Sequence, residues 1–166
     1  MSHSYWQRGL SPTGAVPDQL AIVHHDAKQL GRWESRVEPL YSAGNPRWRE
    51  HPGGKAIDVV ALPLSMTDVA VRFYPIDLAL ADFDMLVQVA MTVSIIGFPF
   101  GLATNGALPI WKTGHIASDP DIEYQGKPAF LVDSSTRGGM SGSPVVVRQY
   151  NGYTDSKGNM YPSLPI

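Results

Sequence analysis

The sequence contains no cysteine, which excludes disulfide bonds and thiolate metal sites. It also lacks any apolar run of about 18 residues, the length that a transmembrane helix needs, so no membrane association is expected. The net charge is −2 and only 17% of the residues are charged, which disfavours nonspecific nucleic-acid binding. Residues 1–6 hold no apolar signal-peptide core, and a cytoplasmic location is the default expectation.

The 166 residues are enough for one domain with a sizeable core. Sixteen glycines and 14 prolines divide the chain into short segments, which is typical of an all-β fold. Apolar and β-branched runs predict strands at residues 20–24, 33–40, 57–64, 69–74, 87–96, 109–118 and 129–133. We expect residues 150–166 to form a loop without another strand.

The most informative stretch is residues 136–147, in which three glycines and two serines precede a run of valines. This pattern predicts a tight loop that leads into a buried strand. Glycines allow backbone N–H groups to turn toward one point, which an oxyanion hole requires. We therefore predict Ser141 as a nucleophile, with the amides of Gly139 and Ser141 as oxyanion donors. A glycine-rich turn with a solvated serine is the alternative.

This stretch resembles the nucleophile loop of the chymotrypsin/trypsin superfamily, Gly-Xaa-Ser-Gly-Xaa-Pro, at Gly139, Ser141, Gly142 and Pro144. It is most similar to that of the bacterial trypsin-like peptidases, including the high-temperature-requirement proteases. The resemblance implies an all-β, chymotrypsin-like double β-barrel and a serine endopeptidase that cleaves peptides or proteins through an acyl-enzyme. It implies no metal and no organic cofactor.

The resemblance also implies a division of the chain. Residues 1–74 would be the remainder of a first barrel, residues 75–86 a linker, and residues 87–166 a second barrel. Residues 97–101 resemble the Gly-Xaa-Pro-Xaa-Gly segment early in that second barrel. The likeness covers roughly residues 18–150, so we expect a barrel fold that is incomplete at both its N- and C-terminal ends.

Asp58 is the candidate acid of a catalytic triad. It heads the aliphatic run Asp-Val-Val-Ala-Leu, which resembles the acid motif of the superfamily. A carboxylate inside an apolar strand is expected to be buried and therefore needs a partner. In a Ser–His–Asp triad the buried acid orients the histidine. Turn capping by the aspartate is the alternative.

The general base is the missing member of the triad, because no histidine follows the superfamily motif Thr/Ala-Xaa-Xaa-His-Val. Only His3 precedes the first predicted strand, as the family order requires, so His3 is the candidate base. His24 and His25 are adjacent in a strand and should point to opposite faces, which argues against a shared metal. A catalytically dead peptidase-like module that binds peptides or proteins is therefore the alternative function.

The resemblance implies that the segment before the nucleophile lines the specificity pocket, with Ser135, Thr136 and Gly138 as substrate-binding residues. Ser135 stands six residues before Ser141, where trypsin-type enzymes have an aspartate that selects basic side chains. A serine at this position carries no charge. We therefore expect a small or apolar substrate side chain beside the cleaved bond.

Overall fold

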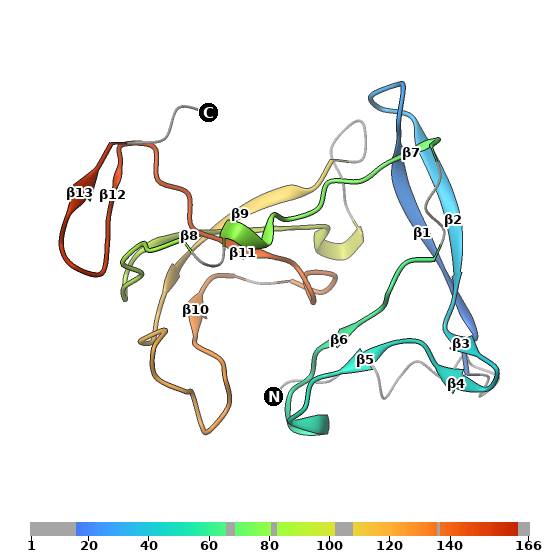
Figure 1. The fold of residues 1–166 in the computed structure, drawn as a ribbon, viewed down its shortest axis with the longest axis horizontal. Helices are drawn as coiled ribbons and strands as arrows, with labels where there is room; N and C mark the ends of the chain where they lie inside the picture. The colour runs from blue at the N-terminus through green and yellow to red at the C-terminus, as the bar shows by residue number, and fades with distance from the viewer. Residues whose placement is uncertain (1–15, 66–68, 81–82, 102–107, 136, 163–166) are drawn as a thin grey trace. The chain divides into compact units, whose positions relative to one another are not determined.

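The structure is a computed structural model, and it describes residues 16–65, 69–80, 83–101, 108–135 and 137–162. Within these ranges the chain consists of strands, loops and single-turn 3₁₀ helices, which confirms the prediction of an all-β chain (Figure 1). The described strands form small open sheets and no closed barrel. Two compact units divide the chain, Met1–Tyr74 and Pro75–Ile166. No described helix has the length and apolarity needed to cross a membrane.

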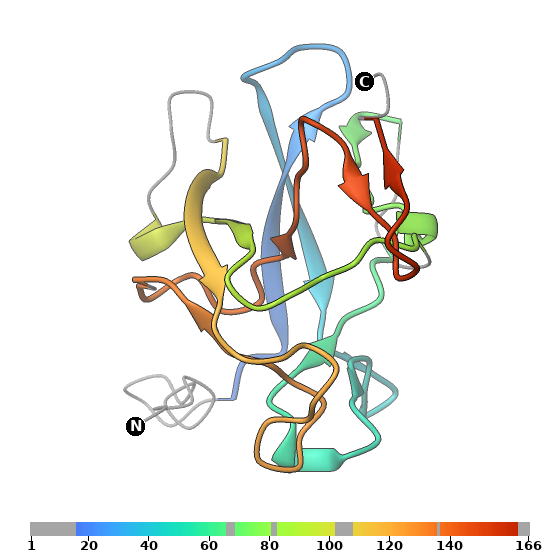
Figure 2. The same ribbon diagram turned by 90° about the vertical axis from the view of Figure 1, so that its left-hand side faces the viewer.

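The first unit is dominated by a long antiparallel hairpin of β1 (Gln19–Asp26) and β2 (Trp33–Pro39), drawn in blue in Figure 2. The turn between the strands is fixed by Asp26 Oδ1, which accepts hydrogen bonds from the amides of Lys28 and Gln29, both at 2.8 Å. These two hydrogen bonds lower the pKa of Asp26, and the bond from the Lys28 amide has the largest effect. Both strands were predicted, with ends within two residues of the observed ones.

The other edge of β1 pairs with β7 (Val71–Arg72) only over two residues, so the predicted strand at 69–74 is shorter than expected. The remaining strands of the first unit form two-residue pairs: β3 (Tyr41–Ser42) with β4 (Asn45–Pro46), and β5 (Arg49–Glu50) with β6 (Val60–Ala61). The 3₁₀ turn η2 (Gly54–Ala56) lies between β5 and β6.

A buried carboxylate connects three segments of the first unit. Glu38 on β2 is only 1% exposed. It accepts hydrogen bonds from the Ser65 amide at 3.0 Å, from Ser65 Oγ at 2.7 Å and from Arg47 Nη1 at 3.1 Å. Arg47 also donates to the backbone carbonyls of Pro39 and Pro63. The Arg47 guanidinium therefore lies in a half-buried network of hydrogen bonds.

The second unit begins with the 3₁₀ turn η3 (Leu78–Leu80) and is built on a four-stranded antiparallel sheet in the order β10-β9-β8-β11. Its strands are β8 (Thr92–Gly97), β9 (Ile110–Ile116), β10 (Val132–Asp133) and β11 (Val145–Val146). Figure 1 shows β8 and β9 running side by side as the centre of this sheet. Val93, Ile95 and Ile116 are buried on it and form its core.

The C-terminal segment corrects one prediction. Residues 150–162 contain a hairpin of β12 (Tyr153–Thr154) and β13 (Met160–Tyr161) instead of a strandless loop. Its turn is closed by Asp155, which is 4% exposed and accepts hydrogen bonds from both amide groups of Asn159, each at 2.8 Å. The Tyr161 hydroxyl donates to the same carboxylate at 3.1 Å. Two-residue strands leave no alternating apolar pattern, so the sequence did not indicate them.

The Asp155 hydrogen bonds predict a pH dependence of this hairpin. They lower the pKa of Asp155 below its ordinary value of 3.8, with the Asn159 side chain as the largest cause. Because the folded-state pKa is lowered, this stabilisation is present above the ordinary value and is lost as the pH falls through the folded value. The Tyr161 pKa is raised above 10.0 by the same carboxylate, so its contribution is lost as the pH rises through that raised value.

We expect the ring resonances of Tyr153 and Tyr161, which stack with centroids 5.0 Å apart, to shift toward unfolded values at the acid end. NMR spectra recorded during an acid titration measure this. Asp155→Asn should remove the acid transition, whereas the exposed Asp121→Asn in the same unit should leave it unchanged. An acid transition that persists in Asp155→Asn contradicts the assignment.

Candidate functional site

The candidate site is the segment that connects β10 to β11, described at residues 134–135 and 137–144 and called the Ser141 loop below. Two consecutive turns shape it: the Met140 amide donates to the Arg137 carbonyl at 3.2 Å, and the Ser143 amide donates to the Met140 carbonyl at 3.1 Å. Met140 is 6% exposed and anchors the loop in the core. Ser141 follows it in the second turn and is exposed. The loop therefore presents the serine on a fixed backbone.

Two glycines in this loop have left-handed backbone angles, Gly139 with φ +88° and Gly142 with φ +79°. A Cβ atom at Gly139 would lie 2.6 Å from the Phe98 carbonyl oxygen and 3.1 Å from the Phe100 amide nitrogen. The Phe100 amide in turn donates to the Gly138 carbonyl at 2.6 Å. The loop is thus held, backbone against backbone, on the turn η4 (Pro99–Gly101) that follows β8.

The amides of Gly139 and Ser141 find no acceptor among the residues that the structure describes, whereas the Met140 amide between them does. A backbone N–H needs an acceptor, and a water molecule or a ligand can supply it. Two such donors beside an exposed serine can bind an oxygen atom that carries negative charge. The oxyanion hole expected from the glycine pattern stays a prediction.

The contacts of Gly97 show on which face of the sheet the Ser141 loop packs. A Cβ atom added at Gly97 would meet Ser143 Oγ, and Met140 Sδ at 3.2 Å. Gly97 is paired with Ile110, so the loop covers the face on which Ile110 and every second residue after it project. His115 belongs to the alternate set on β9 and projects from the opposite face. This histidine therefore lies across the sheet from the loop.

Asp58 lies in the first unit, two residues before β6, and its side chain is exposed. The prediction that it is buried at the head of an apolar strand is wrong. Only Val60 and Ala61 of the predicted strand pair with a neighbour, and Pro63 lacks the N–H that would continue the ladder. Because the strand does not extend to Asp58 and pack it into a core, the Asp58 carboxylate remains exposed to solvent.

His3 and Thr136 were predicted as site residues, and both lie outside the described residues. His51 Nδ1 accepts a hydrogen bond from the Gly53 amide at 3.0 Å and closes a local turn. His115 is the one described histidine of the second unit, and it projects from the face of the sheet opposite the Ser141 loop, so it is not placed to act as the general base.

The adjacent histidines of β1 have separate aromatic partners, which confirms that they point to opposite faces. The His24 ring packs edge-on against Phe73, with centroids 5.2 Å apart. The His25 ring lies 4.0 Å from Trp33 and 5.3 Å from Tyr74, and its Nδ1 atom is buried with no hydrogen-bond partner among the described residues. Both histidines are thus packed within the first unit.

Of the predicted substrate-binding residues, Ser135 is exposed and Gly138 is partly buried. Sequence reasoning missed the residue that contacts Ser135: the Lys112 ammonium donates to the Ser135 carbonyl oxygen and lies 3.4 Å from its Oγ. The signal was a lysine within a predicted strand, on the face that Ile110 and Gly114 share. The structure therefore adds a cation to one end of the Ser141 loop.

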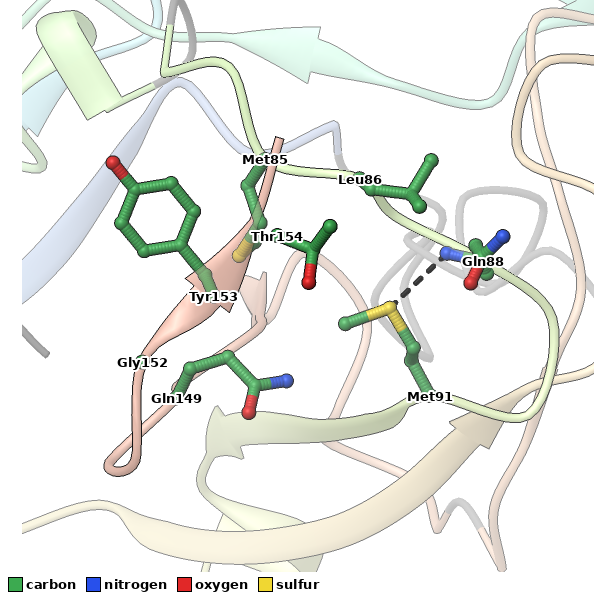
Figure 3. A pocket seen from close by; sticks show the side chains of 8 residues that line it. All are labelled: Met85, Leu86, Gln88, Met91, Gln149, Gly152, Tyr153 and Thr154. Atoms are coloured by element: carbon green, nitrogen blue, oxygen red, sulfur yellow. Dashed lines mark hydrogen bonds between the residues drawn. The ribbon is translucent and has the colours of Figure 1, made fainter. Parts of the chain in front are cut away.

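A separate hollow of about 470 Å³ lies on the surface of the second unit, as Figure 3 shows. The residues that line it are Met85, Leu86, Gln88, Met91, Gln149, Gly152, Tyr153 and Thr154. The Met91 sulfur accepts a hydrogen bond from the Gln88 amide at 3.1 Å. No carboxylate, imidazole or ammonium group lines this hollow, so its lining supplies no acid–base pair.

Comparison with known proteins gives no relative: the chain matches no protein-family model, no curated protein and no solved structure. Its function therefore has to be inferred from the geometry of its own residues.

Proposed function

We propose that this chain is a serine endopeptidase of the chymotrypsin type, with Ser141 as its nucleophile. One observation carries the proposal: an exposed serine stands beside two backbone amides, those of Gly139 and Ser141, that have no acceptor among the described residues. The loop that carries them is fixed by the buried Met140 and by close backbone contacts at Gly139. Fixed donors stabilise developing charge without reorganising during the reaction.

In this proposal Ser141 Oγ attacks the carbonyl carbon of a peptide bond, and its proton passes to a general base. The negative charge that develops on the carbonyl oxygen is bound by the Gly139 and Ser141 amides. The amine leaves with the proton from the base, and water then releases the acyl group from the serine. His3 as the base and Asp58 as its orienting acid are proposals that rest on the sequence pattern.

A second candidate is a peptide-binding module that does not cleave. It is favoured by the position of His115, the one described histidine of the second unit, which lies across the sheet from the Ser141 loop. The same two amides would then bind a carbonyl or carboxylate oxygen of a peptide without activating the serine. An unactivated serine is a weak nucleophile, because its hydroxyl keeps its proton at neutral pH.

Labelling of the full chain with a fluorophosphonate, followed by mass spectrometry of the modified residue, separates the two candidates. A serine endopeptidase should be labelled at Ser141, and Ser141→Ala should abolish labelling. Ser143→Ala in the same loop is the matched control and should retain it, because Ser143 packs against Gly97 and takes no part in the proposed chemistry. A folded chain that is not labelled, or is labelled elsewhere, would overturn the proposal.

A further inference from the structure

Lys112 is the charged residue of β9 that shares a face with the Ser141 loop. It is half-buried on β9 and stands directly opposite Ile95, which is 5% exposed, on β8. Strand alternation places it on the same face as Ile110 and Gly114, the face that the Ser141 loop covers. At a half-buried position of this kind a lysine packs its aliphatic stem against the sheet while its ammonium stays available for hydrogen bonds.

The Lys112 charge is not neutralised by a carboxylate in the described part of the chain. The described ion pairs all lie in the first unit and involve the guanidinium groups of Arg32, Arg36 and Arg47. The Lys112 ammonium instead donates to the neutral carbonyl of Ser135. An ammonium group has three N–H donors, so the bond to Ser135 leaves donors free to bind another acceptor. Because the Ser135 carbonyl is neutral, the positive charge of Lys112 is not compensated by this bond.

The Ser141 loop is positively charged, like Lys112. Arg137 is its only ionisable residue and is exposed. Ser135, which holds the Lys112 ammonium, and Ser141 belong to this one short loop, six positions apart. The loop that carries Ser141 therefore holds one positive charge of its own, contacts a second at Ser135, and contains no acidic residue.

We infer that Lys112 is a specificity-determining residue that selects substrates with an acidic side chain, glutamate or aspartate, beside the bond held at Ser141. This inference rests on the proposed function. It replaces the expectation of a small or apolar side chain, which considered Ser135 alone. A carboxylate can accept a charge-assisted hydrogen bond from the ammonium, whereas the isosteric amide of glutamine offers no charge.

The test is binding of acetylated tetrapeptides that end in Glu, Gln or Lys to the full chain, followed by the NMR shifts of the Gly139 and Ser141 amides. The glutamate peptide should bind at least about tenfold more tightly than the glutamine peptide. Lys112→Met should reduce this ratio to near one, Lys112→Arg should keep it, and Lys112→Glu should favour the lysine peptide. Lys127→Met, at an exposed lysine of the same unit, is the control and should change nothing.

The inference is overturned if no peptide binds, if glutamate and glutamine bind alike, or if the preference survives in Lys112→Met. Failure of the proposed peptidase function is recognised separately by fluorophosphonate labelling. This probe carries no amino-acid side chain, so its reaction with Ser141 does not depend on the selection of acidic side chains by Lys112. If the chain prefers the glutamate peptide through Lys112 but Ser141 is not labelled, the proposed peptidase reaction is refuted and the selection of acidic side chains by Lys112 is supported. Loss of Ser141 labelling in Lys112→Met would show that Lys112 only supports the loop, and would refute the recognition.

Discussion

Gly139→Ala is expected to abolish labelling of Ser141 while the rest of the second unit stays folded. A Cβ atom at this position would lie 2.6 Å from the Phe98 carbonyl oxygen, and backbone atoms cannot move aside as a flexible side chain can. The left-handed φ of +88° adds conformational strain. Together the strain and the overlap should cost about 2–4 kcal/mol, enough to move the loop off the turn that follows β8.

Gly142→Ala is the matched control for this prediction. Its φ of +79° is similar, but a Cβ atom there would meet nothing within 4 Å, so only the conformational term of about 1–2 kcal/mol applies. We expect Gly142→Ala to keep most of the labelling. Hydrogen exchange in β8 and β9, measured by mass spectrometry on both variants, reports whether the sheet itself stays folded. Equal loss of labelling in the two variants would contradict a specific role for the Gly139 contact.

Arg47→Met should destabilise the first unit strongly. The substitution removes the guanidinium that pairs with Glu38, a carboxylate that is 1% exposed, at 3.1 Å. It also removes the donors to the Pro39 and Pro63 carbonyls. Breaking a buried ion pair typically costs about 3–5 kcal/mol, because one charge loses its partner without regaining water.

Arg32→Met provides the comparison for this effect within the same unit. Arg32 is 64% exposed, and its guanidinium lies 3.8 Å from the carboxylates of Asp26 and Glu34. An exposed pair of this kind contributes less than about 1 kcal/mol. Hydrogen exchange of the β1 and β2 amides in increasing urea measures both variants. If the two substitutions shift the unfolding midpoint alike, the Glu38 network is not what stabilises the unit.

The parts of the fold that sequence reasoning predicted well are those with a local signal. The hairpin of β1 and β2 and the strand β9 follow from apolar alternation bounded by turn residues, and their ends were placed within two residues of the observed ones. The shape of the Ser141 loop follows from its glycines, because left-handed angles at Gly139 and Gly142 are difficult for other residues.

The parts that were missed depend on partners distant in the sequence. Glu38 is held by Arg47 and Ser65, and no pattern within β2 indicates that its carboxylate is buried. Lys112 meets Ser135 across 23 positions, so the charge at the loop became visible only in the folded sheet. The prediction that Asp58 is buried was wrong for the opposite reason. Its local motif indicated a strand, but the observed strand β6 begins two residues after it.

The edge of the first unit's sheet has a consequence for solubility. In the described part of the chain β2 pairs only with β1, so one side of this seven-residue strand has no strand beside it. Such an edge can recruit a strand of another molecule and start aggregation. Glu34, Arg36 and Glu38 alternate along one face of β2, and Pro39 ends it. Charges on the inward face and a terminal proline both penalise continued pairing, so the residues that stabilise this unit also protect it from self-association.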